Sequence, residues 1–278
     1  MRITESFAAP SGDVGGSRDG TYDSKLLLWG EEDSPKNYKF NLSHAVTDWK
    51  APRHKHNFDQ FRYLLAGEFV YGEKVLPVGH VAYFPEGIPY GPQIRKQGMS
   101  IVLCQIGGAS GNGFLSTPQR LKAHAELAER GTFYKGVYTW TDENGNKHNQ
   151  DSAEAVYEQA TGGKTTYPEP RYNDIIVMNP DNFEWIPEGG SEGVSIKWLG
   201  TFTERQSSVG FIHIEKGATF QAGTARGVQL CFLVNGGIEY SGRNYPKHTA
   251  FGFDANEGPI GLTATEESKI FFVIGPAF

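Results

Sequence analysis

Short apolar runs alternate with turn residues in the first part of the chain. The turns recur about every ten residues, a spacing that is typical of the strands of a β-sandwich or barrel. The runs that predict strands are KLLLW (25–29), YKFNLSHAV (38–46), QFRYLLAGEFVYG (60–72), HVAYFP (80–85) and SIVLCQI (100–106). The same pattern resumes with DIIVMN (174–179) and continues to residue 278. The chain is therefore predicted to be all-β, with two groups of strands.

The stretch between the two groups of strands has a different pattern, which predicts two short helices. Ser116, Thr117 and Pro118 are typical of a helix start, and RLKAHAELAER continues the helical pattern to Gly131. A second helix is expected from Asp151 to the glycine pair at 162–163. We expect a loose lead-in (1–24), an N-terminal barrel (25–110), a helical connector (111–172) and a C-terminal barrel (173–278).

The two groups of strands are predicted to be copies of one unit. QFRYLLAGEFVYGEKVLP (60–77) aligns with QLCFLVNGGIEYSGRNYP (229–246) at a constant offset of 169 residues. The matched pairs are His44 and His213, Gln60 and Gln229, Gly67 and Gly236, Tyr71 and Tyr240, and Pro77 and Pro246. A fixed offset that joins five residue types is not expected from chance, so the sequence predicts a duplicated β unit.

Composition and charge narrow the class of protein. The 278 residues include 35 Gly and 15 Pro and are 13% aromatic, which suits strands with many turns and excludes a largely disordered chain. The net charge of −6 and the lack of long basic runs argue against a nucleic-acid partner. No apolar stretch approaches the ~18 residues of a membrane span, so no membrane partner is expected. Cys104 and Cys231 are expected to be buried reduced thiols in a cytoplasmic protein.

Two histidines separated by one residue, His54 and His56, are the first candidates for chemistry. On a strand their side chains point to the same side, because side chains alternate with a period of two. Two such imidazoles can bind one metal ion when a neighbouring strand supplies further ligands. The alternative is an ordinary solvated strand.

These histidines belong to a longer pattern that resembles the cupin superfamily. The first cupin motif appears as Asp48, His54, His56, Gln60 and Gly67, and the second as Gly79, Pro85, Gly87, Tyr90 and Ile94. Together with the repeat, the resemblance implies a bicupin, which is a pair of jelly-roll β-barrels. It also implies a metal site at His54, His56 and Gln60, with Tyr90 at the position of the third histidine.

The pattern departs from the family at the ligands. Gln60 replaces a glutamate and removes one negative charge from the site, and Tyr90 replaces a histidine. In the second copy the ligand positions are occupied by Gly223, Ala225, Gln229 and Ile260. The C-terminal barrel is therefore predicted to be structural or ligand-binding, without a metal.

Three further residues are candidates for contact with a substrate. Tyr90 is a candidate for contact with metal or substrate or, alternatively, for packing at the barrel mouth. His44 shares a strand face with Phe40 and is expected to face the barrel interior, as a pocket residue or as a hydrogen-bonded core histidine. Arg62 is expected to point the same way as Gln60, where a guanidinium can clamp a carboxylate; an outward ion pair is the alternative.

Asp59 and Glu86 flank the motifs and are expected to be solvated. A homodimer is expected, since edge strands of such barrels often pair between subunits.

The resemblance implies a metal-dependent enzyme that acts on a small organic substrate, aromatic or carboxylate. HKHNFDQFRYLLAGE (54–68) is similar to the first motif of gentisate-type ring-cleaving dioxygenases, which points to Fe(II), with Mn, Ni or Zn as alternatives. An isomerase or lyase would use the metal as a Lewis acid instead. The rival hypothesis is a non-catalytic bicupin that binds a small molecule or serves a regulatory role.

Overall fold

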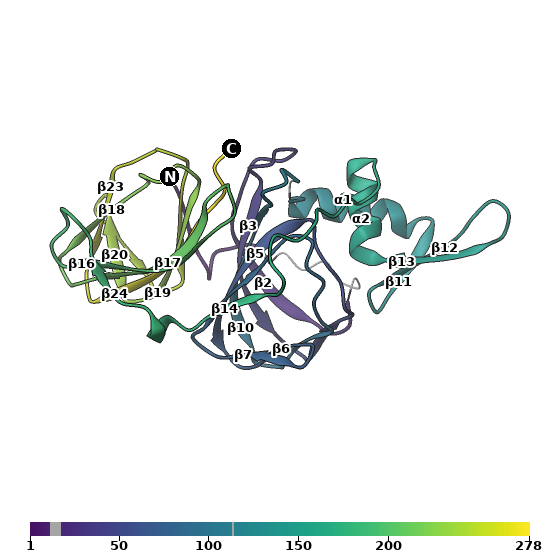
Figure 1. Ribbon diagram of the computed structural model, residues 1–278, viewed down its shortest axis with the longest axis horizontal. Coiled ribbons are helices and arrows are strands. Elements are labelled where there is room, and N and C mark those ends of the chain that lie inside the picture. Colours follow the sequence, from purple (N-terminus) through teal and green to yellow (C-terminus); the bar gives the residue numbers. More distant parts are fainter. Residues whose placement is uncertain (12–17, 113) are drawn as a thin grey trace.

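The computed structural model describes residues 1–11, 18–112 and 114–278. Two β-barrels and a small helical module lie in a row, with the C-terminal barrel at the left of Figure 1 and the module at the right. The expectation of an all-β chain with a partly helical connector is confirmed. No helix in the described ranges is long and apolar enough to cross a membrane.

The N-terminal barrel consists of two sheets. A six-stranded sheet has the order β14-β8-β5-β10-β3-β2, and a four-stranded sheet has the order β4-β9-β6-β7. The strands are β2 (Tyr22–Trp29), β3 (Tyr38–Ala45), β4 (Trp49–Ala51), β5 (Phe58–Ala66), β6 (Phe69–Tyr71), β7 (Lys74–Leu76), β8 (Val81–Phe84), β9 (Gln93–Arg95), β10 (Ser100–Gly107) and β14 (Ile176–Met178). Paired neighbours are antiparallel throughout, as expected for a chain that turns back every few residues.

The C-terminal barrel repeats this plan. Its seven-stranded sheet has the order β1-β22-β19-β24-β17-β16-β15, and its four-stranded sheet has the order β18-β23-β20-β21. The strands are β1 (Arg2–Glu5), β15 (Ile186–Pro187), β16 (Val194–Phe202), β17 (Ser207–Ile214), β18 (Thr219–Ala222), β19 (Gln229–Asn235), β20 (Gly237–Tyr240), β21 (Arg243–Pro246), β22 (Thr249–Phe253), β23 (Ile260–Ala264) and β24 (Ser268–Ile274). Gly67 and Gly236, a matched pair of the repeat, both have positive φ and both turn the chain after the matching strands β5 and β19.

Each barrel takes an edge strand from outside its own repeat. β1 precedes the N-terminal barrel in the chain but pairs with β22 of the C-terminal sheet, and β14 pairs with β8 of the N-terminal sheet. Residues 2–5 are therefore a paired strand and not part of a loose lead-in. Residues 176–178, which we expected in the C-terminal barrel, complete the N-terminal sheet.

The connector forms a module of its own. Helix α1 (Thr117–Ala128) begins with a capping box between Ser116 and Gln119, and α2 (Ser152–Thr161) is capped by Asp151 and ends at Gly162 in the left-handed conformation. Both predicted helices are thus present. A three-stranded sheet of β11 (Gly131–Tyr134), β12 (Val137–Thr141) and β13 (Lys147–Asp151) was not predicted. A one-turn 3-10 helix, η1 (Pro180–Asn182), follows β14.

The two barrels pack on each other through aromatic side chains of their larger sheets. Phe202 of β16 stacks on Tyr83 of β8 with ring centroids 4.2 Å apart, and Tyr63 of β5 stacks on Phe271 of β24 at 5.1 Å. These rings belong to one buried cluster that includes side chains from both barrels. The outer face of the N-terminal sheet is therefore apolar where the two barrels meet.

Candidate functional site

His54 and His56 lie at the mouth of the N-terminal barrel, in the loop that leads into β5 and not on the strand itself. His54 bridges to Tyr90 through a backbone pair, and its ring lies edge-to-face to that of His56, with centroids 4.9 Å apart. Burial lowers the pKa of His54 to about 4 and lowers that of His56 well below its usual value. Both imidazoles are therefore neutral at neutral pH.

Behind the histidines, Arg62 is the centre of a buried polar cluster. Its Nη2 donates to Gln60 Oε1 at 2.8 Å and to Tyr90 Oη at 3.0 Å, and its Nη1 donates to Gln93 Oε1 at 2.9 Å. Gln60 Nε2 also donates to Tyr90 Oη at 2.8 Å. Arg62 is 2% exposed, and its guanidinium lies 3.9 Å from the centroid of the Phe84 ring. Arg62 and Gln60 thus point the same way, and of the two alternatives for Arg62 the structure has the inward one.

The side chains that the cupin pattern assigns to a metal do not fit one as they are arranged. Gln60 Oε1 accepts hydrogen bonds from Arg62 and from Gln105, and Tyr90 Oη accepts two more. His54 Nε2 lies 3.1 Å from Gln93 Nε2, so its lone pair accepts an amide proton. In the ranges that the structure describes, no group of three or more His, Cys, Asp or Glu is placed to hold a metal ion.

His44 lies outside this site. It is exposed on β3, and its Nδ1 lies 2.9 Å from Ser100 Oγ on the neighbouring strand β10. The expectation that His44 faces the barrel interior is wrong, because Phe40 on the same face packs in the core between the barrels. Strand alternation correctly groups these residues, but the apolar side of β3 is its outer side.

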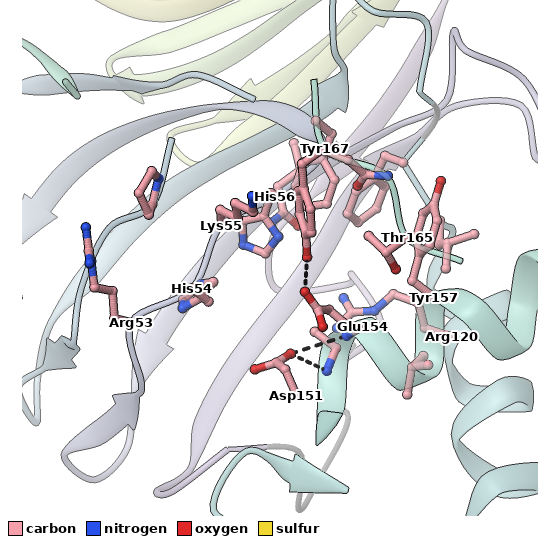
Figure 2. Close-up of a pocket in the computed structure, with 18 residues that line it drawn as sticks. Arg53, His54, Lys55, His56, Arg120, Asp151, Glu154, Tyr157, Thr165 and Tyr167 are labelled. Atoms are coloured by element: carbon pink, nitrogen blue, oxygen red, sulfur yellow. Dashed lines mark hydrogen bonds between the residues drawn. The ribbon is translucent and has the colours of Figure 1, made fainter. Parts of the chain in front are cut away.

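A cavity of about 390 Å³ opens beside the two histidines. Figure 2 shows Lys55 and His56 of the barrel loop on one side of the cavity and Glu154 and Tyr157 of α2 on the other. The barrel loop, the two helices and the segment around Thr165 all contribute to its wall. The cavity thus lies between the barrel mouth and the helical module.

Three residues that line the cavity have polar groups without a partner among the described residues. Asn57 is 3% exposed, and its Nδ2 makes no hydrogen bond to any described residue; the same holds for the buried Thr165 Oγ1. The Arg120 guanidinium forms no ion pair within the described ranges, and burial lowers its pKa. Sequence reasoning missed all three residues, since none belongs to the motif ligands and two of them lie in the connector.

The charged and aromatic side chains of the cavity wall favour an anionic, planar ligand. Of the two carboxylates, Asp151 pairs with Arg18 at 3.4 Å and Glu154 accepts a hydrogen bond from the Tyr167 hydroxyl. Lys55 Nζ lies 4.2 Å from the centroid of the Tyr167 ring. The aromatic side chains of the wall are Phe58, Phe114, Tyr157 and Tyr167. Arg53, Lys55 and Arg120 outnumber the two carboxylates, one of which pairs with Arg18, so the cavity combines an excess of positive charge with apolar faces.

The acidic residues that flank the motifs are buried, contrary to expectation. Asp59 and Glu86 are each 1% exposed. Glu86 accepts hydrogen bonds from Ser110 and pairs with Arg171 at 2.7 Å, and Arg171 also binds Glu204 of the second repeat. Asp59 Oδ1 accepts the backbone N–H of Glu86 at 2.8 Å. These carboxylates hold the segments together and do not line the cavity.

Asp59 provides a pH-dependent test of this packing. Burial, opposed by the Glu86 N–H, raises the pKa of Asp59 from 3.8 to about 7. Between these values the folded protein holds a proton that the unfolded chain has released, so the free energy of unfolding falls as pH rises, by up to about 1.4 kcal/mol per unit. Asp59→Asn is expected to remove this part of the slope in urea unfolding at pH 5 and pH 7. The exposed Asp48→Asn is the control and keeps the slope; an unchanged slope in Asp59→Asn would contradict the assignment.

The C-terminal barrel has no comparable cluster. At the position of Arg62 it has Cys231, which is fully buried and unpaired, as expected for both cysteines. Gln229, the counterpart of Gln60, accepts the backbone N–H of Gly223 at 2.7 Å. The interior around them is apolar.

Comparison with known proteins adds the class of fold. No protein-family model and no curated protein matches the sequence. Among solved structures, a proposed dioxygenase from Nostoc punctiforme matches with a TM-score of 0.64 and 11% identity over 100% of this chain and 83% of its own. Oxalate decarboxylase from Lactobacillus farciminis, in complex with formate, matches with a TM-score of 0.56 and 11% identity over 100% of this chain and 87% of its own. Oxalate decarboxylase from Bacillus subtilis, which has Mn(II) centres, matches with a TM-score of 0.54 and 13% identity over 100% of this chain and 78% of its own.

These matches cover the whole chain. The resemblance to bicupins read from the sequence motifs is thus confirmed for the fold: the protein is a bicupin in architecture.

Proposed function

We propose that this protein binds a small organic acid in the cavity between the N-terminal barrel and the helical module, and that binding needs no metal. The observation that carries this proposal is the guanidinium of Arg120, which lines the cavity and forms no ion pair with any described residue. A cation that is partly withdrawn from water and has no anionic partner costs free energy, so a ligand that carries negative charge and accepts its hydrogen bonds is favoured there.

The rest of the wall supports an aromatic or similarly flat acid. Phe58 and Phe114 pack edge-to-face with centroids 5.0 Å apart, and Tyr157 and Tyr167 enclose the other side. Such walls bury a ring, while a small number of polar groups fix its orientation. The complex of the Lactobacillus farciminis neighbour with formate shows that a protein of this fold binds a carboxylate.

A thermal-shift comparison of acids with their neutral amides tests the proposal. We expect benzoate and 1-naphthoate to raise the unfolding temperature in a concentration-dependent way, because a ligand that binds only the folded state stabilises it. Benzamide and 1-naphthamide have the same shape without the charge and should give little shift. Equal shifts for acids and amides, or none for any acid, would contradict the proposal.

A metal-dependent, dioxygenase-like enzyme is the second candidate. Two observations favour it: the imidazoles of His54 and His56 lie 4.9 Å apart, and His56 makes no hydrogen bond to any described residue. The Mn(II) centres of the Bacillus subtilis neighbour show that this fold can hold a metal. Metal binding by the purified protein separates the two candidates.

A further inference from the structure

We propose that the guanidinium of Arg62 takes the place of the metal ion in the N-terminal barrel, so that the residues at the ligand positions of the cupin pattern serve as its hydrogen-bond partners. The site then carries a permanent internal cation and does not bind a divalent metal. This inference is independent of which molecule occupies the neighbouring cavity.

The hydrogen bonds of Arg62 join it directly to two of the ligand positions. Two of the four pattern positions, Gln60 and Tyr90, accept from the same atom, Nη2, at 2.8 and 3.0 Å. Both are neutral groups where the family has an anion and an imidazole, and a guanidinium fork suits such planar acceptors. Arg62 forms no ion pair with any described carboxylate. A divalent ion beside this buried cation would meet strong repulsion, because no described carboxylate pairs with Arg62 to offset its charge.

The third ligand position, His54, is linked to Arg62 through Gln93. Gln93 Oε1 accepts from Arg62 Nη1 at 2.9 Å, so its amide nitrogen faces His54 Nε2 at 3.1 Å. The other ring nitrogen, Nδ1, lies 2.7 Å from the carbonyl oxygen of Pro52 and donates to it. Both nitrogens of His54 are thus occupied, and His56 is the one ligand position that makes no hydrogen bond to a described residue, which leaves one imidazole lone pair free. A single imidazole is a poor site for a divalent ion.

The second barrel shows that the fold itself does not require this arginine. Its matching strand β19 packs with Cys231 at the position of Arg62, and Ile260 stands at that of Tyr90. The buried charge is therefore specific to the barrel that has the cavity. Of its neutral partners at the ligand positions, Gln60 has a like residue in the second barrel, Gln229, and Tyr90 does not.

Metal titration of the full chain tests the inference. Protein stripped with EDTA is titrated calorimetrically with Mn(II), Zn(II) and, without oxygen, Fe(II), and its metal content is then measured. We expect no binding to the wild type. The variant Gln60→Glu/Arg62→Leu/Tyr90→His, which removes the cation and restores an acid and an imidazole, is expected to take up about one Mn(II) per chain. The matched control Gln60→Glu/Tyr90→His keeps Arg62 and is expected to bind none.

Three results would overturn the inference. These are wild-type binding of about one metal per chain that His56→Ala abolishes, Mn(II) binding by the control as tight as by the triple variant, and a folded triple variant without affinity for Mn(II). A measurement on the wild type alone guards against misfolding of the variants. In ¹⁵N NMR spectra, His54 is expected to be the Nδ1–H tautomer with signals unchanged by Zn(II); signals that move with Zn(II) contradict the proposal.

Discussion

Arg120→Gln is expected to weaken the binding of aromatic acids by about tenfold to a hundredfold. The guanidinium lines the cavity without an ion pair to any described residue, so in the complex it faces the carboxylate of the ligand. A hydrogen bond to a charged group contributes about 1.5–3 kcal/mol, which corresponds to that loss of affinity. Calorimetric titration of benzoate and 1-naphthoate into the two proteins measures it directly.

Arg53→Gln is the matched control, because Arg53 also lines the cavity but is exposed to water at its rim. Solvent screens its charge, so we expect at most a few-fold change in affinity at moderate salt. If Arg53→Gln weakens binding more than Arg120→Gln, the carboxylate lies at the rim and our assignment of the half-buried Arg120 is wrong.

Phe202→Ala is expected to lower the free energy of unfolding by about 3–5 kcal/mol, the usual cost of deleting a large buried ring. Phe202 is 6% exposed and stacks on Tyr83 of the other barrel, with Phe61 at 5.7 Å. Its loss opens a cavity in the core that both barrels share, where rigid strands on both sides limit collapse. Urea unfolding followed by fluorescence and by circular dichroism gives the value.

Trp198→Ala on the same strand is the control for that experiment. Trp198 is 45% exposed, so its removal is expected to cost about 1 kcal/mol. Equal costs for the two variants would mean that the packing between the barrels contributes little, and would contradict the description of one continuous core.

The duplicated β unit could be predicted from the sequence because short antiparallel strands leave local signals. Alternating apolar residues and glycine turns recur at the same offset in both copies, as the matching turns at Gly67 and Gly236 show. The exchange of β1 and β14 between the barrels left no such signal. These edge strands have only 4 and 3 residues, and β1 pairs with residues nearly 250 positions away.

The site was predicted in part. Residue spacing placed Gln60 and Arg62 on one face, as the structure has them, but left open whether Arg62 points inward. It misplaced His44, since alternation says which residues share a face but not which face is inward, and here the outer face is also apolar. It could not find Arg120, because that residue reaches the cavity only through the packing of the helical module on the barrel mouth.

The central claim is that the cavity between the N-terminal barrel and the helical module binds an organic acid without a metal. It is tested most directly by calorimetric titration of 1-naphthoate into EDTA-stripped protein, repeated after addition of Mn(II) or Fe(II). We predict saturable binding, about one ligand per chain as expected for one cavity, with the same affinity in all three samples. Binding that appears only after a metal is restored would contradict the account.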